Sequence, residues 1–435
     1  MPNITCSRSA RYITSIAVVT AATLLVTGCG RSDDEATTVS SSAIDDSPAT
    51  GTVTLWAPDG DATVIEDILV PFAEANPDLD VEVTLVPADE YTTKLQAAIA
   101  AGKTPDIAQL YTEAQAQFLD PAVFEAVPDG VATSTDFFPG AWDAGVLDET
   151  PYSVPWYTYT RVLVYRDDFA DAGGVTPPTS QAEMVPFLKG LEDGGAVKGI
   201  GTDVGWDGYN GQAIALYTWQ NGGDILSADG SEWTLDTPEV VEAITYNASF
   251  FAEGVASPDG PLFLDAIPYF LEGKTGAMVT GPWVLNQITG ATDEPDWLAE
   301  HVATAPLPAG SANNVGTVGG GSWGVLTDTE NSDASWKVVR YLTEPETQIA
   351  QYNAFGSMPA VQSAWDDSSI ADQPLLAAFF DQLQNTVSFP QSSTWPQVAA
   401  HIGSEFETVV RAGVSPEEAA ANIQSFAENL GTGTE

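Results

Sequence analysis

The regular alternation of two hydrophobic periods between residues 52 and 111 most constrains what this chain can fold into. Segments 52–58, 79–86 and 105–111 carry the continuous or alternating apolar residues of strands. Between them, ATVIEDILVPFAEANP and DEYTTKLQAAIAAGK place apolar residues three and four apart, as amphipathic helices do. Strands that alternate with such helices predict an α/β fold built on a doubly wound, parallel sheet. Ligands bind such sheets where the strands end, so the residues after each strand are the most informative.

The rest of the chain continues the mixture of helices and short strands. Segment 236–254 has the pattern of a helix and segment 275–281 that of a strand. The glycine run at 319–321 precedes a strand pattern and lacks the GxGxxG order, so it is a weak signal for a dinucleotide site. We find no internal repeat, and a chain of this length should divide into two lobes.

The N-terminus has the features of an exported protein. Residues 1–28 contain Arg8 and Arg11, no acidic residue, and an apolar run that is short for a membrane span. The sequence VTGC, which ends at Cys29, resembles a bacterial lipobox, in which the chain is cut before the cysteine and the sulfur is acylated. The alternative is an ordinary signal peptide with an incidental cysteine. Cys6 would leave with the signal, so the mature chain could form no internal disulfide.

Composition then describes the mature protein. Residues 29–50 carry few large apolar side chains, which predicts a flexible tether between the lipid and a soluble body. The mature chain from Cys29 has eleven Lys and Arg and 61 Asp and Glu, which gives a net charge of −50 with His neutral. Such a field excludes nucleic acid and anionic lipid as partners. We therefore expect an extracytoplasmic protein that is anchored to the cell membrane by lipid and does not cross it.

A family resemblance rests on eight segments in a fixed order. They are VTLW, FAEANP, YTTKLQAAIAAGKTPDI, YSVPWYTYTRVLVYRDD, YTWQNGGDIL, MVTGPW, GGGSWGVL and FPQSSTWPQV. Together they resemble the carbohydrate-type extracellular solute-binding proteins of ABC importers, over nearly the whole body from about 51 to 430. The resemblance implies a type II periplasmic-binding-protein fold of two hinged α/β lobes with the ligand between them. It implies a carbohydrate ligand, the transmembrane subunits of an ABC permease as partners, and no cofactor or bound metal; we expect a monomer.

The same resemblance implies the lobe boundaries. The N-terminal lobe takes residues 51–157 with 320–358, and the C-terminal lobe takes 158–316 with 360–431. The chain would cross between lobes near Tyr157-Thr158, near 316–320 and near 357–360. Small residues at two of these crossings suit a hinge.

Trp283 is the strongest candidate for contact with a ligand. Gly281 permits a tight exit from a strand and Pro282 sets the first turn of a helix, so the next side chain can project into a cleft. The resemblance assigns the tryptophan of a GPW segment to stacking on a sugar. An aromatic ring suits the flat C–H face of a sugar, and polar side chains suit its hydroxyls. The alternative is a tryptophan of the core.

Several other candidates come from their positions in the resembling segments. Trp395 aligns with the last aromatic contact of the family, and Glu113 aligns with a sugar-binding acid, although helix surface is an equal alternative. Tyr157, Tyr159 and Arg161 lie where the family crosses between lobes and lines the cleft. Trp323 follows the glycine run, and strand core is an equal alternative for it.

The remaining candidates have weaker support. Asp59 and Asp61 follow the first strand and could accept hydroxyl protons, although Asp is also a common turn residue. Trp206, Asp207 and Tyr209 form a loop-like GWDGYNG segment.

The specificity of the family does not carry over in full. Family members that bind maltose have an acid and a tyrosine where this chain reads Ile-Ala-Leu at 214–216, an arginine where Ala399 stands, and a cleft glutamate at the position of Tyr159. Maltose itself is therefore a doubtful ligand.

Two other functions compete with sugar binding. An exported glycoside hydrolase needs a pair of carboxylates, which an acidic chain can supply. However, His301 and His401 fit no metal-ligand spacing, and GxSxG and HExxH are absent, so we expect no enzyme and no catalytic residue. A second alternative is a cationic solute, such as a polyamine or quaternary amine, held by aromatic rings.

Overall fold

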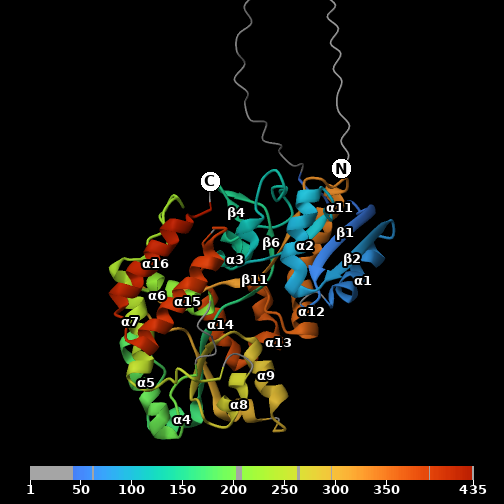
Figure 1. Cartoon of the computed structure of the whole chain (residues 1–435). Coiled ribbons are helices and arrows are strands. Elements are labelled where there is room, and N and C mark those ends of the chain that lie inside the picture. The colour runs from blue at the N-terminus through green and yellow to red at the C-terminus, as the bar shows by residue number, and fades with distance from the viewer. Residues whose placement is uncertain are drawn as a thin grey trace, which may run out of the picture. The chain divides into compact units, whose positions relative to one another are not determined.

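The computed structural model describes residues 43–433 except 61–62, 202–207, 262–264, 295 and 391. These residues form a five-stranded and a three-stranded sheet, together with two two-stranded ones, and helices pack around them (Figure 1). Within this part of the chain, no helix is both long and apolar enough to span a membrane.

Five strands form the first sheet: β1 (Gly51–Pro58), β2 (Leu79–Val86), β3 (Ile107–Tyr111), β6 (Val154–Tyr159) and β11 (Gly319–Val325). Their order is β2-β1-β3-β11-β6. β1 runs parallel to β2 and β3, as the sequence predicts. β11 runs antiparallel to β3 and β6, so a segment that follows them by more than 150 residues completes the sheet.

Helices cover both faces of this sheet: α1 (Ile65–Ala75), α2 (Ala88–Ala101), α11 (Ser332–Leu342) and α12 (Pro345–Phe355). α1 buries Ile65, Ile68 and Leu69, which is the face that its periodicity predicts. Together with α11 it closes a core on one face of the sheet. α2 packs Tyr91 and Leu95 into a separate core on the other face. Covering both faces makes this a doubly wound α/β layer.

The second sheet has three strands: β7 (Val162–Arg166), β8 (Ala277–Thr280) and β9 (Val302–Ala305). Their order is β8-β7-β9, and both outer strands run antiparallel to β7. The parallel pairing predicted from residues 52–111 holds for β1–β3, whereas this sheet, for which no strand direction was predicted, is antiparallel. Hydrophobic periodicity carries no information on strand direction, and more than 100 residues separate β7 from β8, so the local pattern leaves the direction open.

Helices of the second half surround this sheet or form their own layer. α6, α7, α15 and α16 bury a core that includes Trp395 and Phe406 and lies beside the second sheet (Figure 1). The elements of this half are α4 (Asp167–Gly173), α5 (Gln181–Gly194), α6 (Gly208–Gln220), α7 (Pro238–Ala252), α8 (Ala266–Leu271), α9 (Trp283–Ala291), α10 (Trp297–His301), α13 (Ser368–Ala371), α14 (Ala377–Leu383), α15 (Trp395–Ala412) and α16 (Pro416–Leu430). Shorter elements are α3 (Pro139–Asp143), β4 (Val146–Leu147), β5 (Thr150–Pro151), β10 (Gly316–Thr317) and β12 (Thr386–Val387).

Arg166 joins several elements at the end of β7. Its guanidinium donates to both carboxylate oxygens of Asp168, at 2.7 and 2.6 Å, and to the carbonyl of Phe270 at 3.1 Å. The rings of Phe169 and Trp297 lie 4.1 and 5.0 Å from its central carbon. A buried cation of this kind is stable only because its donors are paired and its flat faces are covered.

The chain passes between the two sheets at three places. The first is Thr160-Arg161, which joins β6 to β7, so Tyr157 and Thr158 still belong to the first sheet. The second lies between β10 and β11. The third follows α12, where Thr158 donates its backbone N–H to Met358 at 2.9 Å. The resemblance implied a first crossing near Tyr157-Thr158, and the connection between the two sheets follows directly after Tyr159.

Residues 43–50 are packed against the body, although the sequence predicted them to be part of a flexible tether. Ile44 and Ala49 are buried, at 8% and 1% exposure. The buried ammonium of Lys337 in α11 donates to Asp45 at 3.0 Å and to Ser47 at 2.9 Å. This contact, which we call the N-terminal clip, spans 292 residues and could not be read from local composition. The described chain is therefore attached to α11 from Ile44 onward.

The clip should give the folded state a pH-dependent contribution. The hydroxyl and backbone N–H of Ser47, with the ammonium of Lys337, hold the pKa of Asp45 well below its usual 3.8. A lowered carboxyl pKa adds stability above the unfolded value and loses it as pH falls toward the folded value. We expect Asp45→Asn to lower the melting temperature slightly at pH 7, and we expect this difference from the parent to shrink below about pH 4. Thermal unfolding of both proteins at pH 7 and pH 3 measures it, and a difference that grows toward pH 3 would contradict the clip.

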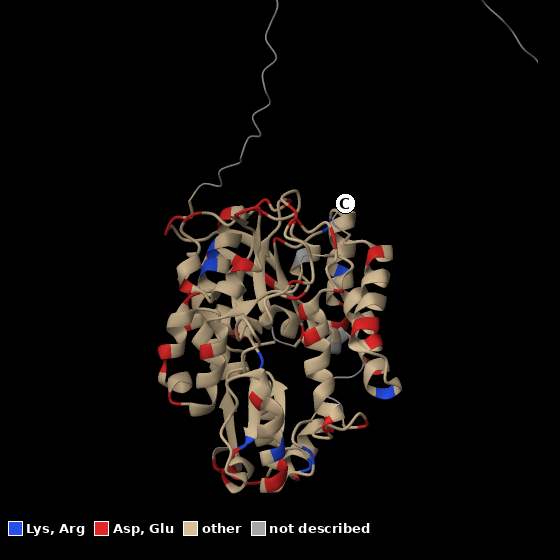
Figure 2. Cartoon of the chain, turned by 90° about the vertical axis from the view of Figure 1, so that its left-hand side faces the viewer, with Lys and Arg blue, Asp and Glu red and all other residues tan. Residues whose placement is uncertain are grey.

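Acidic side chains are spread over the described surface, as Figure 2 shows. Basic side chains are few, and several lie against a carboxylate, such as Lys189 with Glu253 at 2.6 Å and Lys274 with Glu272 at 2.5 Å. Exposed pairs of this kind contribute about 0–1 kcal/mol each. Because the sequence has 61 Asp and Glu but only 13 Lys and Arg, ion pairs can neutralise few of the carboxylates, and the remainder give the body its negative field.

Candidate functional site

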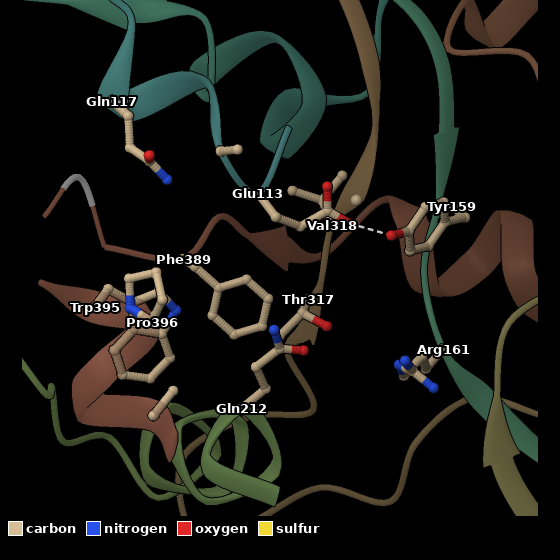
Figure 3. A pocket seen from close by; sticks show the side chains of 13 residues that line it. Glu113, Gln117, Tyr159, Arg161, Gln212, Thr317, Val318, Phe389, Trp395 and Pro396 are labelled. Carbon is tan, nitrogen blue, oxygen red and sulfur yellow. Dashed lines mark hydrogen bonds between the residues drawn. The ribbon is translucent and has the colours of Figure 1, made fainter. Parts of the chain in front are cut away.

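A first cavity of about 440 Å³ lies between elements of both halves of the fold (Figure 3). Its size falls within the range of about 300–1,000 Å³ typical of small-molecule sites. Segments after β3, at the β6–β7 connection, in α6, before β11 and in α15 all contribute to it. The lining residues are Glu113, Ala114, Gln117, Tyr159, Arg161, Gln212, Thr317, Val318, Gly319, Phe389, Trp395, Pro396 and Ala399.

The polar side chains of the first cavity come mainly from the ends of strands. Glu113 follows the carboxyl end of β3, where a parallel sheet presents its ligand-binding residues. Tyr159, at the end of β6, donates its hydroxyl to the Glu113 carboxylate. Arg161 lines the same space from the connection to β7, and the amides of Gln117 and Gln212 face it from two other elements (Figure 3).

The opposite side of the first cavity is aromatic. Trp395 opens α15, and its ring stacks on Phe389 with centroids 5.8 Å apart and planes 19° from parallel. Trp395 is mostly covered, with 4% of it exposed, so only part of the ring faces the cavity. α15 approaches α6 closely because Gly211 leaves no side chain against the backbone of Ala399. This close approach sets the distance between Gln212 and Trp395.

A second cavity of about 430 Å³ adjoins the first at Tyr159, which lines both. Trp283 lines this cavity from the start of α9, together with Asn286 and Gln287 of the same helix. The structure explains the GPW sequence, because the Trp283 ring folds back over Gly281 and a side chain there would collide with it. The full lining is Tyr111, Tyr157, Tyr159, Pro282, Trp283, Asn286, Gln287, Gly320, Phe355, Gly356, Ser357 and Met358.

Trp283 also contacts two residues that line the first cavity, Tyr159 and Arg161. The edge of its ring meets Tyr159, with centroids 5.1 Å apart and planes at 87°. The guanidinium carbon of Arg161 lies 5.5 Å from its ring centroid, a cation–π contact.

The glycine run explains the position of the two tyrosines. A side chain at Gly319 would collide with the ring of Tyr159, and one at Gly321 would approach the ring of Tyr157. Gly320 has φ of +139°, a conformation that strongly favours glycine. Residues 319–321 therefore provide a surface without side chains on which the tyrosine rings lie.

Trp323 requires a correction. Its side chain is fully buried in the core of the first sheet, where it packs on Trp156 with ring centroids 4.7 Å apart. Strand alternation turns position 323 toward the same core as Val325, away from both cavities. It is a core residue in this structure, and we leave it out of the site.

The other sequence candidates fall outside the two cavities or outside the described residues. Asp59 is exposed and accepts the backbone N–H of Ala88 at 3.0 Å, which is turn chemistry. Tyr209 lies in the first turn of α6, but its side chain is not described. The residues outside the described part are Cys29, Asp61, Trp206 and Asp207.

Sequence reasoning missed several lining residues. Tyr111 is the last residue of β3, so the rule that ligands bind at strand ends could have identified it. Phe389 lies in the quoted FPQSSTW segment but was not singled out. Gln212, Asn286 and Gln287 lie on helices, and no local signal distinguishes them from surface amides.

The arrangement suits reversible binding of a polar, ring-shaped solute. Rings on one side can cover C–H faces, and a carboxylate, a guanidinium and amides can pair with hydroxyls. Among the described lining residues of the two cavities, Glu113 alone carries a carboxylate, whereas glycoside hydrolysis uses two. Among the residues that the structure describes, no three His, Cys, Asp or Glu are grouped to hold a metal ion.

Comparison with known proteins gives consistent results. Residues 56–349 match the family model described as bacterial extracellular solute-binding protein. A putative binding protein of Brucella abortus is 26% identical over 349 residues, which are 77% of this chain and 81% of the relative. A maltotriose-binding protein of Pyrococcus abyssi is 22% identical and aligns with 72% of this chain and 67% of its own length. The solved structure of the sugar-binding protein MalE from Xanthomonas citri superposes with a TM-score of 0.80 at 26% identity, covering 87% of this chain and 97% of that one.

Proposed function

Because this chain belongs to the family of bacterial extracellular solute-binding proteins, we propose that it captures a neutral mono- or oligosaccharide and delivers it to an ABC importer. The observation that carries this proposal is the pair of cavities that meet at Tyr159, whose linings combine aromatic rings with a carboxylate, a guanidinium and amides. A buried hydroxyl that lacks a partner costs about 1–3 kcal/mol, so a solute rich in hydroxyls needs such a lining. The names of the relatives support a carbohydrate, since they include a maltotriose-binding protein and a sugar-binding protein.

The mechanism we propose is passive capture between two hinged lobes. The resemblance gives the lobes as residues 51–157 with 320–358 and residues 158–316 with 360–431. We place the first boundary at Thr160, because β6 ends at Tyr159. A solute that contacts both halves binds the closed arrangement more tightly and so shifts the population toward it. The closed form would then dock on the permease.

We also propose that Cys29 carries a lipid that holds the protein at the outer face of the membrane. The basic, apolar start of the chain and the VTGC sequence support this. The clip fixes the chain to α11 from Ile44 onward, so a lipid on Cys29 would be joined to the body through the residues between Cys29 and Ile44.

A thermal-shift screen of saccharides with the purified protein tests the proposal. A ligand at 100 times its dissociation constant adds about 2.7 kcal/mol to the stability, a clear rise in melting temperature. Calorimetry of the best ligand at two salt concentrations should give the same affinity, because a neutral solute has no charge to screen. An affinity that falls steeply with salt would indicate a cationic solute instead, although Arg161 in the cavity disfavours one. Release of shorter sugars from an oligosaccharide would indicate a hydrolase.

A further inference from the structure

Tyr159 occupies the boundary between the two cavities. The first cavity extends from its ring toward Trp395, and the second extends toward Trp283. The cavities are of similar size, about 440 and 430 Å³, and Tyr159 is the residue that their linings share. Its ring therefore separates two spaces, either of which is large enough for a small ligand.

Three contacts from different elements hold the ring in this position. Its hydroxyl donates to the carboxylate of Glu113, beyond the end of β3. Its face lies over Gly319 of β11, where no side chain competes for the space. The ring of Trp283 contacts it edge to face at the wall of the second cavity. A hydrogen bond to a charged acceptor is stronger than one between neutral groups, so the ring position is well defined.

We propose that Tyr159 is a specificity-determining residue that limits the length of the saccharide by dividing the binding cleft into two compartments. The proposal rests on the proposed function, because it concerns the same cleft. With the ring held by Glu113, a linear chain cannot run from Trp395 to Trp283, and a short saccharide fills one compartment. The carboxylate of Glu113 accepts the hydroxyl of Tyr159 and still has acceptor capacity left for a solute hydroxyl. Glu113 therefore both holds the dividing ring and can bind the solute.

Calorimetry with linear gluco-oligosaccharides and galacto-oligosaccharides of one to six units tests the partition. We expect the affinity of the parent protein to stop rising once the chain fills one compartment. Tyr159→Ala joins the two spaces, so its affinity should continue to rise with length, by 10-fold or more between the plateau length and six units. Tyr159→Phe keeps the ring but loses the bond to Glu113. We expect its affinity also to continue rising with chain length, but only by a few-fold. Tyr341→Phe removes a hydroxyl bonded to the Ile68 carbonyl outside both cavities and should leave the profile unchanged.

The outcomes separate this proposal from the proposed function. If the parent binds saccharides but Tyr159→Ala has the same length profile, the partition is wrong and the binding function stands. A parent affinity that rises steadily to six units also overturns the partition. If neither protein binds any sugar in the series, the proposed function fails and the partition fails with it. If Tyr159→Ala does not fold, Tyr159→Phe decides, and a length profile equal to that of the parent overturns the partition, because the proposal requires the Glu113 bond to hold the ring in place.

Discussion

Replacement of Trp283 by alanine is expected to weaken saccharide binding by about 2–4 kcal/mol, which is roughly 30- to 700-fold in the dissociation constant. The ring lines the second cavity, meets Tyr159 edge to face and lies under the guanidinium of Arg161. Its removal takes away a stacking surface together with the ring contacts to Tyr159 and Arg161, so the loss exceeds that of the ring area alone. Titration calorimetry with the best saccharide from the screen measures the effect.

The fold should survive this change, because Trp283 is only half-buried and packs at the margin of its core. Trp142 provides a matched control, since it is also half-buried, stacks on Phe137 and lines neither cavity. Trp142→Ala should leave the affinity unchanged. An unchanged affinity in Trp283→Ala, with both proteins folded by circular dichroism, would remove Trp283 from the site.

Replacement of Gly211 by alanine is expected to destabilise the protein by about 1–3 kcal/mol, the usual cost of overpacking a well-packed contact. The added methyl would overlap the backbone oxygen of Ala399, and a backbone atom cannot move aside as a flexible side chain can. α6 and α15 must then separate, which shifts Gln212 and Trp395 in the first cavity. We therefore expect a lower melting temperature together with weaker binding.

Gly290 is the control for this substitution. It lies exposed in α9, and an added methyl there would meet no atom within 4 Å. Alanine is favoured over glycine in helices by up to about 1 kcal/mol, so Gly290→Ala should be neutral or stabilising. Equal melting temperatures for the two variants would contradict the close contact between α6 and α15.

Much of the fold follows from local patterns in the sequence. β2 has the predicted bounds, α2 ends at Gly102 as expected, and α1 buries the apolar stripe of its helical period. These features depend on residues within one or two turns of each other, so a short window contains all the information that they need. Strand direction in the second sheet depends on distant connections and was not predicted.

The candidate site divides in the same way. Trp283 and Trp323 both adjoin strands in glycine-containing segments, yet one lines a cavity and the other is buried on Trp156. Trp323 lies within β11, whose core-facing side is fixed by pairing with β3 about 200 residues away, whereas Trp283 opens the helix α9. Sequence patterns could identify candidate aromatic residues but not the direction in which each ring points.

The sequence by itself determined the α/β class, the acidic field of the body and the strand-to-helix corner at Gly281-Pro282, because each is a property of composition or of neighbouring residues. Only the tertiary structure decided that residues 43–50 are fixed to Lys337 and that Tyr159, between the two cavities, hydrogen-bonds to Glu113. It also decided that the missing side chain at Gly211 lets α15 pack closely on α6. These contacts join residues 46 to 292 positions apart or depend on the absence of a side chain opposite a distant backbone. Their energy exists only once folding has brought the partners together, so no local pattern records it.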